Sequence, residues 1–209
     1  MKKHLVLALA ALALVACGNT TSATPTTATP TVAPTTAAPT IQTITIDKDD
    51  QTELKAACAG SVYHTGVIVD FTTDGTKWAY SDQFGLPSAE YNPGYAEHNL
   101  FQAKKNAGAV YNTEALVAGY TKITVKFFAK FESQAAQYLP VVKEGTAADA
   151  LTAVTADAAD PLPGTAAGWS DGSNAQYEYT CTYNVKADST FFSIGAGAGA
   201  LYLESIVVA

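Results

Sequence analysis

The chain of 209 residues contains no arginine. Proteins that bind nucleic acids depend on arginine and lysine for contacts with phosphates and base edges, and many phosphate or carboxylate sites use the guanidinium fork. The 19 acidic residues also outnumber the 12 lysines, which gives a net charge of −7. The composition therefore argues against a nucleic-acid partner, whereas the acidity by itself names no other partner.

The sequence also lacks the short motifs that carry catalysis. It contains neither a Gly-x-Ser-x-Gly elbow nor a His-Glu-x-x-His zinc motif. The glycine-rich residues 195–199 do not fit a phosphate loop, because β-type runs lie on both sides of them and predict a hairpin turn. His64 and His98 could belong to a triad, but no pattern supports one. We therefore expect no enzyme and no catalytic residue, with an unrecognised active site as the alternative.

No apolar run is long enough to cross a bilayer. Residues 5–16 form an uninterrupted apolar run, but a membrane-spanning helix needs about 20 such residues. Lys2 and Lys3 precede this run and Cys17 follows it, which is the layout of an export signal. The segment Leu14-Val15-Ala16-Cys17 resembles the lipobox of bacterial lipoproteins. The resemblance implies a signal peptide over 1–17, lipid on Cys17, and an extracytoplasmic protein anchored to the cell membrane or outer membrane.

Large apolar side chains are scarce in the next segment. Residues 20–40 consist of Thr, Ala, Pro, Ser and one Val. Such a segment has little to bury and cannot offset the entropy lost on ordering. We therefore expect residues 18–40 to be a disordered tether and residues 41–209 to be one domain.

Cysteine is also rare, with three residues in the chain. If Cys17 carries lipid, Cys58 and Cys181 remain, and an exported protein matures in an oxidising environment. This context predicts a Cys58–Cys181 disulfide, with two unpaired buried thiols as the alternative.

Metal sites have weak support. Two distant cysteines are too few for a zinc site. Oxygen-rich clusters suit calcium, although neither cluster here has a complete calcium loop, and solvated acidic turns are the alternative. We expect no cofactor and no metal, with a structural Ca²⁺ as an open option. The two clusters are Asp47, Asp49, Asp50 and Glu53, and Asp171, Ser173 and Asn174.

The strongest structural signal is a period of two, whereas helical signals are scarce. In residues 121–132, Ile123, Val125, Phe127, Ala129 and Phe131 share one face, with Phe128 as the exception. Residues 176–186 alternate in the same way. Further strands are predicted at 41–46, 67–72, 77–81, 190–194 and 200–208, with a turn at 73–75, a short helix at 50–57 and an ambiguous Ala-rich stretch at 147–156. This pattern predicts an all-β chain folded as a β-sandwich, with a jelly roll as the expected topology.

Several stretches of the domain carry a family resemblance. They are TKITVKFFAKF (121–131), YLPVVKEG (138–145), YEYTCTYNV (177–185) and FFSIGAGAGALYLESIVV (191–208), with VDFTTDGTKWAYSDQFG (69–85) as a looser match. Together they resemble the β-jelly-roll modules appended to secreted bacterial polysaccharide-degrading enzymes, especially pectate-lyase-type proteins. The resemblance implies a carbohydrate-binding or accessory role, and it assigns no binding residue.

The aromatic residues are the best indication of function. Sugar rings have apolar faces, so exposed aromatic side chains beside amides and carboxylates make a suitable surface for a glycan. We therefore expect a glycan as partner and a membrane contact through the lipid, and the protein partner stays unknown. The alternative is a structural or protein-interaction domain of the cell envelope whose aromatic side chains are buried in its core. The candidate ligand-binding residues are Trp78 and Tyr80 in a short strand, Tyr91 and Tyr95 in the polar loop 90–99, and Trp169, Asp171 and Asn174 in the polar loop 168–177.

Overall fold

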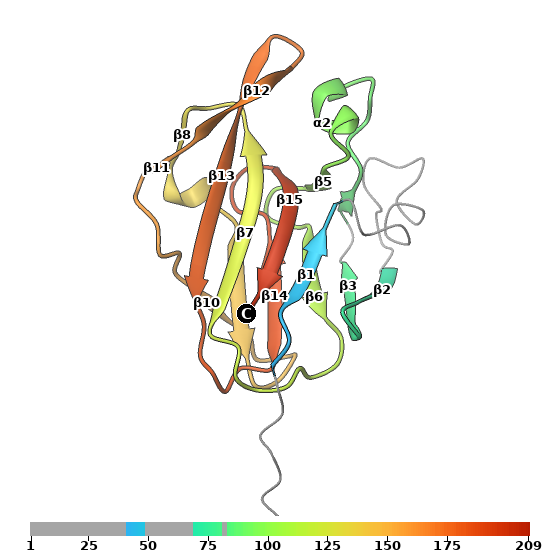
Figure 1. Ribbon diagram of the computed structural model, residues 1–209, viewed down its shortest axis with the longest axis vertical. Coiled ribbons are helices and arrows are strands. Elements are labelled where there is room, and N and C mark those ends of the chain that lie inside the picture. The colour runs from blue at the N-terminus through green and yellow to red at the C-terminus, as the bar shows by residue number, and fades with distance from the viewer. Residues whose placement is uncertain (1–40, 49–68, 81–82) are drawn as a thin grey trace, which may run out of the picture. The chain divides into compact units, whose positions relative to one another are not determined.

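The computed structural model describes residues 41–48, 69–80 and 83–209, and it confirms the predicted all-β class (Figure 1). The strands form two large antiparallel sheets and one small sheet. In Figure 1 the seven-stranded sheet faces the viewer, with β13, β7, β15 and β1 side by side. Within the described residues, no helix has the length and hydrophobicity that a bilayer span requires.

The seven-stranded sheet has the order β12 (Thr165–Asp171), β13 (Asn174–Asn184), β7 (Lys122–Ala129), β15 (Leu201–Val208), β5 (Phe101–Ala103) and β4 (Phe84–Gly85), and β1 (Ile44–Asp47) pairs with the end of β15. The six-stranded sheet has the order β10 (Thr152–Val154), β9 (Val141–Gly145), β14 (Phe191–Gly195), β6 (Ala109–Asn112), β3 (Thr76–Tyr80) and β2 (Val69–Thr73). The small sheet pairs β11 (Leu162–Pro163) with β8 (Ser133–Gln134), and the described helices are α2 (Pro93–Glu97) and the 3₁₀ turn η1 (Ala136–Tyr138).

The two strands with the clearest period of two lie next to each other in the seven-stranded sheet. Cys181 on β13 pairs with Val125 on β7, and both side chains are buried. The alternating residues on either side of this pair are also buried, as the sequence predicts. On β15 the register shifts between Leu203 and Ser205, so the buried positions change parity there. This bulge keeps both halves of β15 facing the core.

One hydrophobic core joins the two large sheets. It contains Val125 and Tyr179 from the seven-stranded sheet together with Phe192 and Trp78 from the six-stranded sheet. From β5 to β7 the chain moves from one large sheet to the other and back, as it does again from β13 through β14 to β15. The structure therefore confirms a β-sandwich, and the jelly roll stays a prediction.

Two glycine-containing segments were predicted to be turns of hairpins, and the structure confirms only the first. Asp74 and Gly75 both have positive φ values, of 47° and 72°, and they join β2 to β3 as the predicted tight turn. The glycine-rich residues 195–199 were expected to form a hairpin, and this prediction is wrong because β14 and β15 lie in different sheets. A Cβ on Gly197 would lie 2.6 Å from the carbonyl oxygen of Gln137, so glycine allows the crossing segment to pack closely against η1.

Some predictions lie outside the described residues. These are the signal peptide, the tether, the short helix at 50–57, most of the first acidic cluster, His64 and Cys58. Cys181 is fully buried on β13, but its expected partner Cys58 is not described, so the disulfide stays a prediction. The Ala-rich stretch contains β10 (Thr152–Val154), which includes the β-branched Thr152 and Val154, and this agrees with its weak helical signal.

Candidate functional site

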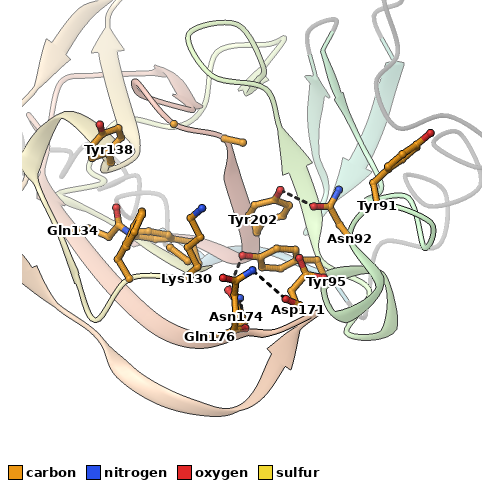
Figure 2. Close-up of a pocket in the computed structure, with 15 residues that line it drawn as sticks. Tyr91, Asn92, Tyr95, Lys130, Gln134, Tyr138, Asp171, Asn174, Gln176 and Tyr202 are labelled. Atoms are coloured by element: carbon orange, nitrogen blue, oxygen red, sulfur yellow. Dashed lines mark hydrogen bonds between the residues drawn. The ribbon is translucent and has the colours of Figure 1, made fainter.

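A pocket opens at the end of the seven-stranded sheet where β7 ends and where β13 and β15 begin. Its volume is about 440 Å³, which lies within the range of about 300–1,000 Å³ that is usual for small-molecule sites. Figure 2 shows side chains from both sides of the pocket surrounding a central space. We call it the tyrosine pocket, and its aromatic lining consists of Tyr91, Tyr95, Phe127, Phe131, Tyr138 and Tyr202.

Two stacked tyrosines form the centre of one wall. The rings of Tyr95 and Tyr202 lie 3.6 Å apart between centroids and are parallel within 2°. The Tyr95 hydroxyl donates a 2.6 Å hydrogen bond to Oε1 of Gln176. Burial, together with Tyr202 and Asp171, raises the pKa of Tyr95 above its ordinary value, so this hydroxyl stays protonated and remains a donor. Only 4% of Tyr95 is exposed, so it shapes the wall rather than offering a free face.

Hydrogen bonds hold the polar part of this wall. Oδ1 of Asp171 accepts a 2.9 Å bond from the backbone N–H of Gly94, which ties the α2 segment to the β12–β13 hairpin. Glycine is needed here, because a Cβ on Gly94 would lie 2.5 Å from the Ser170 carbonyl oxygen. The amide of Gln176 donates to the carbonyl of Asn174 at 2.9 Å. Polar groups are therefore held at the pocket by the fold itself.

The exposed aromatic side chains gather at this pocket. Among the described residues with known burial, the exposed aromatic side chains are Tyr91 (72%), Phe131 (57%) and Tyr138 (41%). All three line the pocket, although they come from three separate segments. Aromatic surface is normally buried in a soluble domain, so this concentration is a feature of the site rather than of the whole surface.

Trp169 supports the pocket without lining it. It lies in β12 rather than in the predicted loop, and it is half-buried. Its ring meets Tyr95 edge-on at 5.6 Å, stacks on His98 at 4.2 Å and lies 5.3 Å from Phe128. Phe128, the exception to the alternation of β7, therefore belongs to a second small cluster on the outer face of the sheet. Trp169 thus packs against Tyr95 and does not line the pocket, and its contact with a ligand stays a prediction.

Trp78 and Tyr80 do not belong to the site, and their prediction as ligand contacts is wrong. Both are fully buried in the main core. The Trp78 indole N–H donates a 2.7 Å bond to the Thr76 hydroxyl, and the Tyr80 ring packs against Phe84 at 5.1 Å. The face that they share on β3 is the inner face, because both side chains belong to the core between the two large sheets.

Of the seven predicted binding residues, the structure brings four to the pocket lining, namely Tyr91, Tyr95, Asp171 and Asn174. Sequence reasoning missed the rest of the lining. Tyr202 had a usable signal, since it faces away from the core between the apolar Leu201 and Leu203. Phe131 was assigned to the core face of its strand, but β7 ends at Ala129 and the alternation ends with it. Asn92 and Gln176 lie within the predicted polar loops 90–99 and 168–177 but were not singled out. Lys130, Gln134 and Tyr138 had no signal.

The chemistry available in the pocket is recognition by polar contacts and ring faces. Asp171 is the one carboxylate among the described lining residues, whereas glycosidases usually place two carboxylates across the scissile bond. In the described part of the chain, no three His, Cys, Asp or Glu side chains cluster as a metal site would require. Among the described residues, the pocket lining therefore holds neither a cluster of metal ligands nor a pair of carboxylates.

Comparisons of the chain with protein-family models, with curated proteins and with solved structures found no match.

Proposed function

We propose that the domain of residues 41–209 binds a glycan in the tyrosine pocket and is held at a membrane surface by lipid on Cys17. One observation carries this proposal: Tyr91, Phe131 and Tyr138, the exposed aromatic side chains among the residues whose burial is described, gather around one pocket. They stand beside amides and a carboxylate that hydrogen bonds hold in place.

The proposal follows from the chemistry of sugars. A pyranose ring presents C–H groups on its faces and hydroxyl groups around its edge, so it needs both an apolar surface and hydrogen-bond partners. Tyr91 and Tyr138 provide ring faces with a polar tip. The amides of Asn92 and Asn174 provide donors and acceptors, and the carboxylate of Asp171 provides an acceptor for hydroxyl groups.

The anchor and the tether support this reading from the sequence. A lipid on Cys17 would place the domain outside the cytoplasm, where cell-surface and environmental polysaccharides are found. The tether of residues 18–40 would separate the domain from the lipid surface, since a Pro-rich chain extends by about 3.1 Å per residue. A binding module needs such reach, because its ligand lies beyond the membrane.

A glycan array probed with the purified full chain tests the proposal. We expect selective binding that Tyr91→Ala weakens by about 1–3 kcal/mol, the usual cost of truncating an aromatic anchor at a binding site. Val117→Ala is the matched control, because Val117 is also an exposed apolar side chain but does not line the pocket. Equal binding by the wild type and by Tyr91→Ala would rule out this pocket as the site.

The alternative function is a structural or protein-interaction domain of the cell envelope. The burial of Trp78, Tyr80 and Tyr95 favours it, because these side chains serve packing rather than contact with a ligand. Under this alternative the protein binds no glycan on the array. Chemical cross-linking on intact cells should then capture the same envelope protein in repeated experiments. Loss of that cross-link in Tyr91→Ala would assign the pocket to the protein partner.

A further inference from the structure

We infer that the tyrosine pocket selects an anionic glycan, one whose sugars carry carboxylate or sulfate groups, and that Lys130 is the residue that sets this selectivity. This inference rests on the proposed function, and it names the substrate class of the same site.

Lys130 is the one basic residue among the described residues that line the pocket. It follows β7 directly, where the strand ends and the chain bends. Its ammonium lies 5.2 Å from the centroid of the Phe131 ring. Figure 2 shows the Lys130 side chain inside the ring of labelled residues, between Gln134 on one side and Tyr95 and Tyr202 on the other. The charge is therefore presented to the space that a ligand would enter.

The charge of Lys130 is not neutralised within the described structure. Lys77 pairs with Glu114, and Lys126 pairs with both Glu178 and Glu204, but no described carboxylate forms an ion pair with Lys130. Asp171, the carboxylate of the pocket, already accepts a bond from the Gly94 N–H and belongs to another wall. An anionic group of a ligand would supply the missing partner and form a charge-assisted hydrogen bond.

The negative net charge of the protein means that a preference for anionic glycans has to arise within the pocket. The net charge of the chain is −7, so a polyanion is repelled by the molecule as a whole. Non-specific attraction therefore cannot bring an acidic polysaccharide to this protein. Any preference for acidic over neutral glycans must come from a local cation, and Lys130 is placed to provide it.

The test measures binding of the purified full chain to alginate, hyaluronan and chondroitin sulfate, each beside its carboxyl-reduced or desulfated form. Dextran and starch serve as neutral polysaccharides. We expect at least one acidic polymer to bind and its neutralised form to bind about tenfold more weakly, the order of loss for one charge-assisted hydrogen bond. Comparing the carboxyl-reduced and the desulfated forms shows which anionic group is recognised.

Variants assign the effect to one side chain. Lys130→Gln should lose about tenfold in affinity for the acidic polymer and retain the remaining affinity for its neutralised form, whereas Lys130→Arg should keep the preference. Lys143→Gln is the matched control, since Lys143 is an exposed lysine on β9 that does not line the pocket. Circular dichroism confirms that each variant is folded.

Three outcomes would contradict the inference. Equal affinity for an acidic polymer and its neutralised form would overturn the selectivity and leave the proposed function intact. An unchanged preference in folded Lys130→Gln would remove Lys130 from that role. If the wild type binds none of these polymers and no glycan on the array, the proposed function fails and the inference fails with it.

Discussion

Replacing Trp169 with alanine tests the construction of the pocket wall. The side chain is half-buried, and it contacts Tyr95, His98 and Phe128. Truncation of a fully buried tryptophan costs about 3–5 kcal/mol, and each aromatic pair adds about 0.5–1.5 kcal/mol. Because the side chain is only partly buried, we expect Trp169→Ala to lower the free energy of unfolding by about 2 kcal/mol, less than the cost for a fully buried tryptophan.

Urea denaturation followed by circular dichroism measures this change. For a domain of this size the melting temperature should fall by about 4–8 °C. Trp169→Phe is the matched control, since it retains a ring against Tyr95 and should recover about half of the loss. The same variant should bind glycan more weakly, because Tyr95 loses the ring packed against its edge. A loss of stability below about 0.5 kcal/mol, the level of an ordinary surface substitution, would refute this packing role.

Three further predictions concern single groups. Tyr95→Phe should lower the free energy of unfolding by about 1–3 kcal/mol, because Gln176 loses the donor of a buried hydrogen bond, and urea denaturation measures it. Burial raises the pKa values of four tyrosines in the folded state, whereas the unfolded chain releases these protons near pH 10; the four are Tyr95, Tyr120, Tyr179 and Tyr183. Their contribution to the free energy of unfolding should therefore stay level up to about pH 10 and be lost above it. Urea denaturation at a series of pH values measures this, and a fall that begins near neutral pH would contradict it. If Cys58 and Cys181 are bonded and Cys17 carries lipid, titration of the unreduced, denatured protein should find no free thiol, and reactive thiols would contradict the disulfide. Cys17→Ser should abolish labelling by a radioactive fatty acid, and a labelled Cys17→Ser variant would contradict lipidation of Cys17.

The fold was largely predictable, because alternation is a local signal. The alternating residues of β7 and β13 give the buried face of each strand, and Asp74-Gly75 gives a hairpin turn. Local signals do not tell which face of a short strand packs on the core, so Trp78 and Tyr80 on β3 were assigned to an exposed surface although both are fully buried. They also do not tell whether two neighbouring strands pair, so the crossing at residues 195–199 was read as a hairpin.

The site was less predictable because its contacts join distant parts of the chain. Tyr95 bonds to Gln176 across 81 positions, and the Tyr202 hydroxyl meets Asn92 across 110 positions. In each of these two contacts the partners lie too far apart in the sequence for a local pattern to link them. Composition did identify the polar aromatic segments, which is why Tyr91 and Asp171 were found. Lys130 had no signal, since only the fold places it beside an aromatic wall.

The pairing of β1 with β15 has a mechanical consequence. Ile44 lies opposite Val208 at one end of β15, and Tyr202 lines the pocket near the other end. If the tether leads to a membrane and the pocket holds a polysaccharide, a pull between them runs parallel to these two strands. Their hydrogen bonds then carry the load together in shear, instead of opening one after another as in a peeled edge. Thr45 adds two ties to the β2–β3 hairpin, to the Thr73 hydroxyl and the Asp74 carboxylate. β1 is thus fastened to both large sheets, as resistance to such a pull would require.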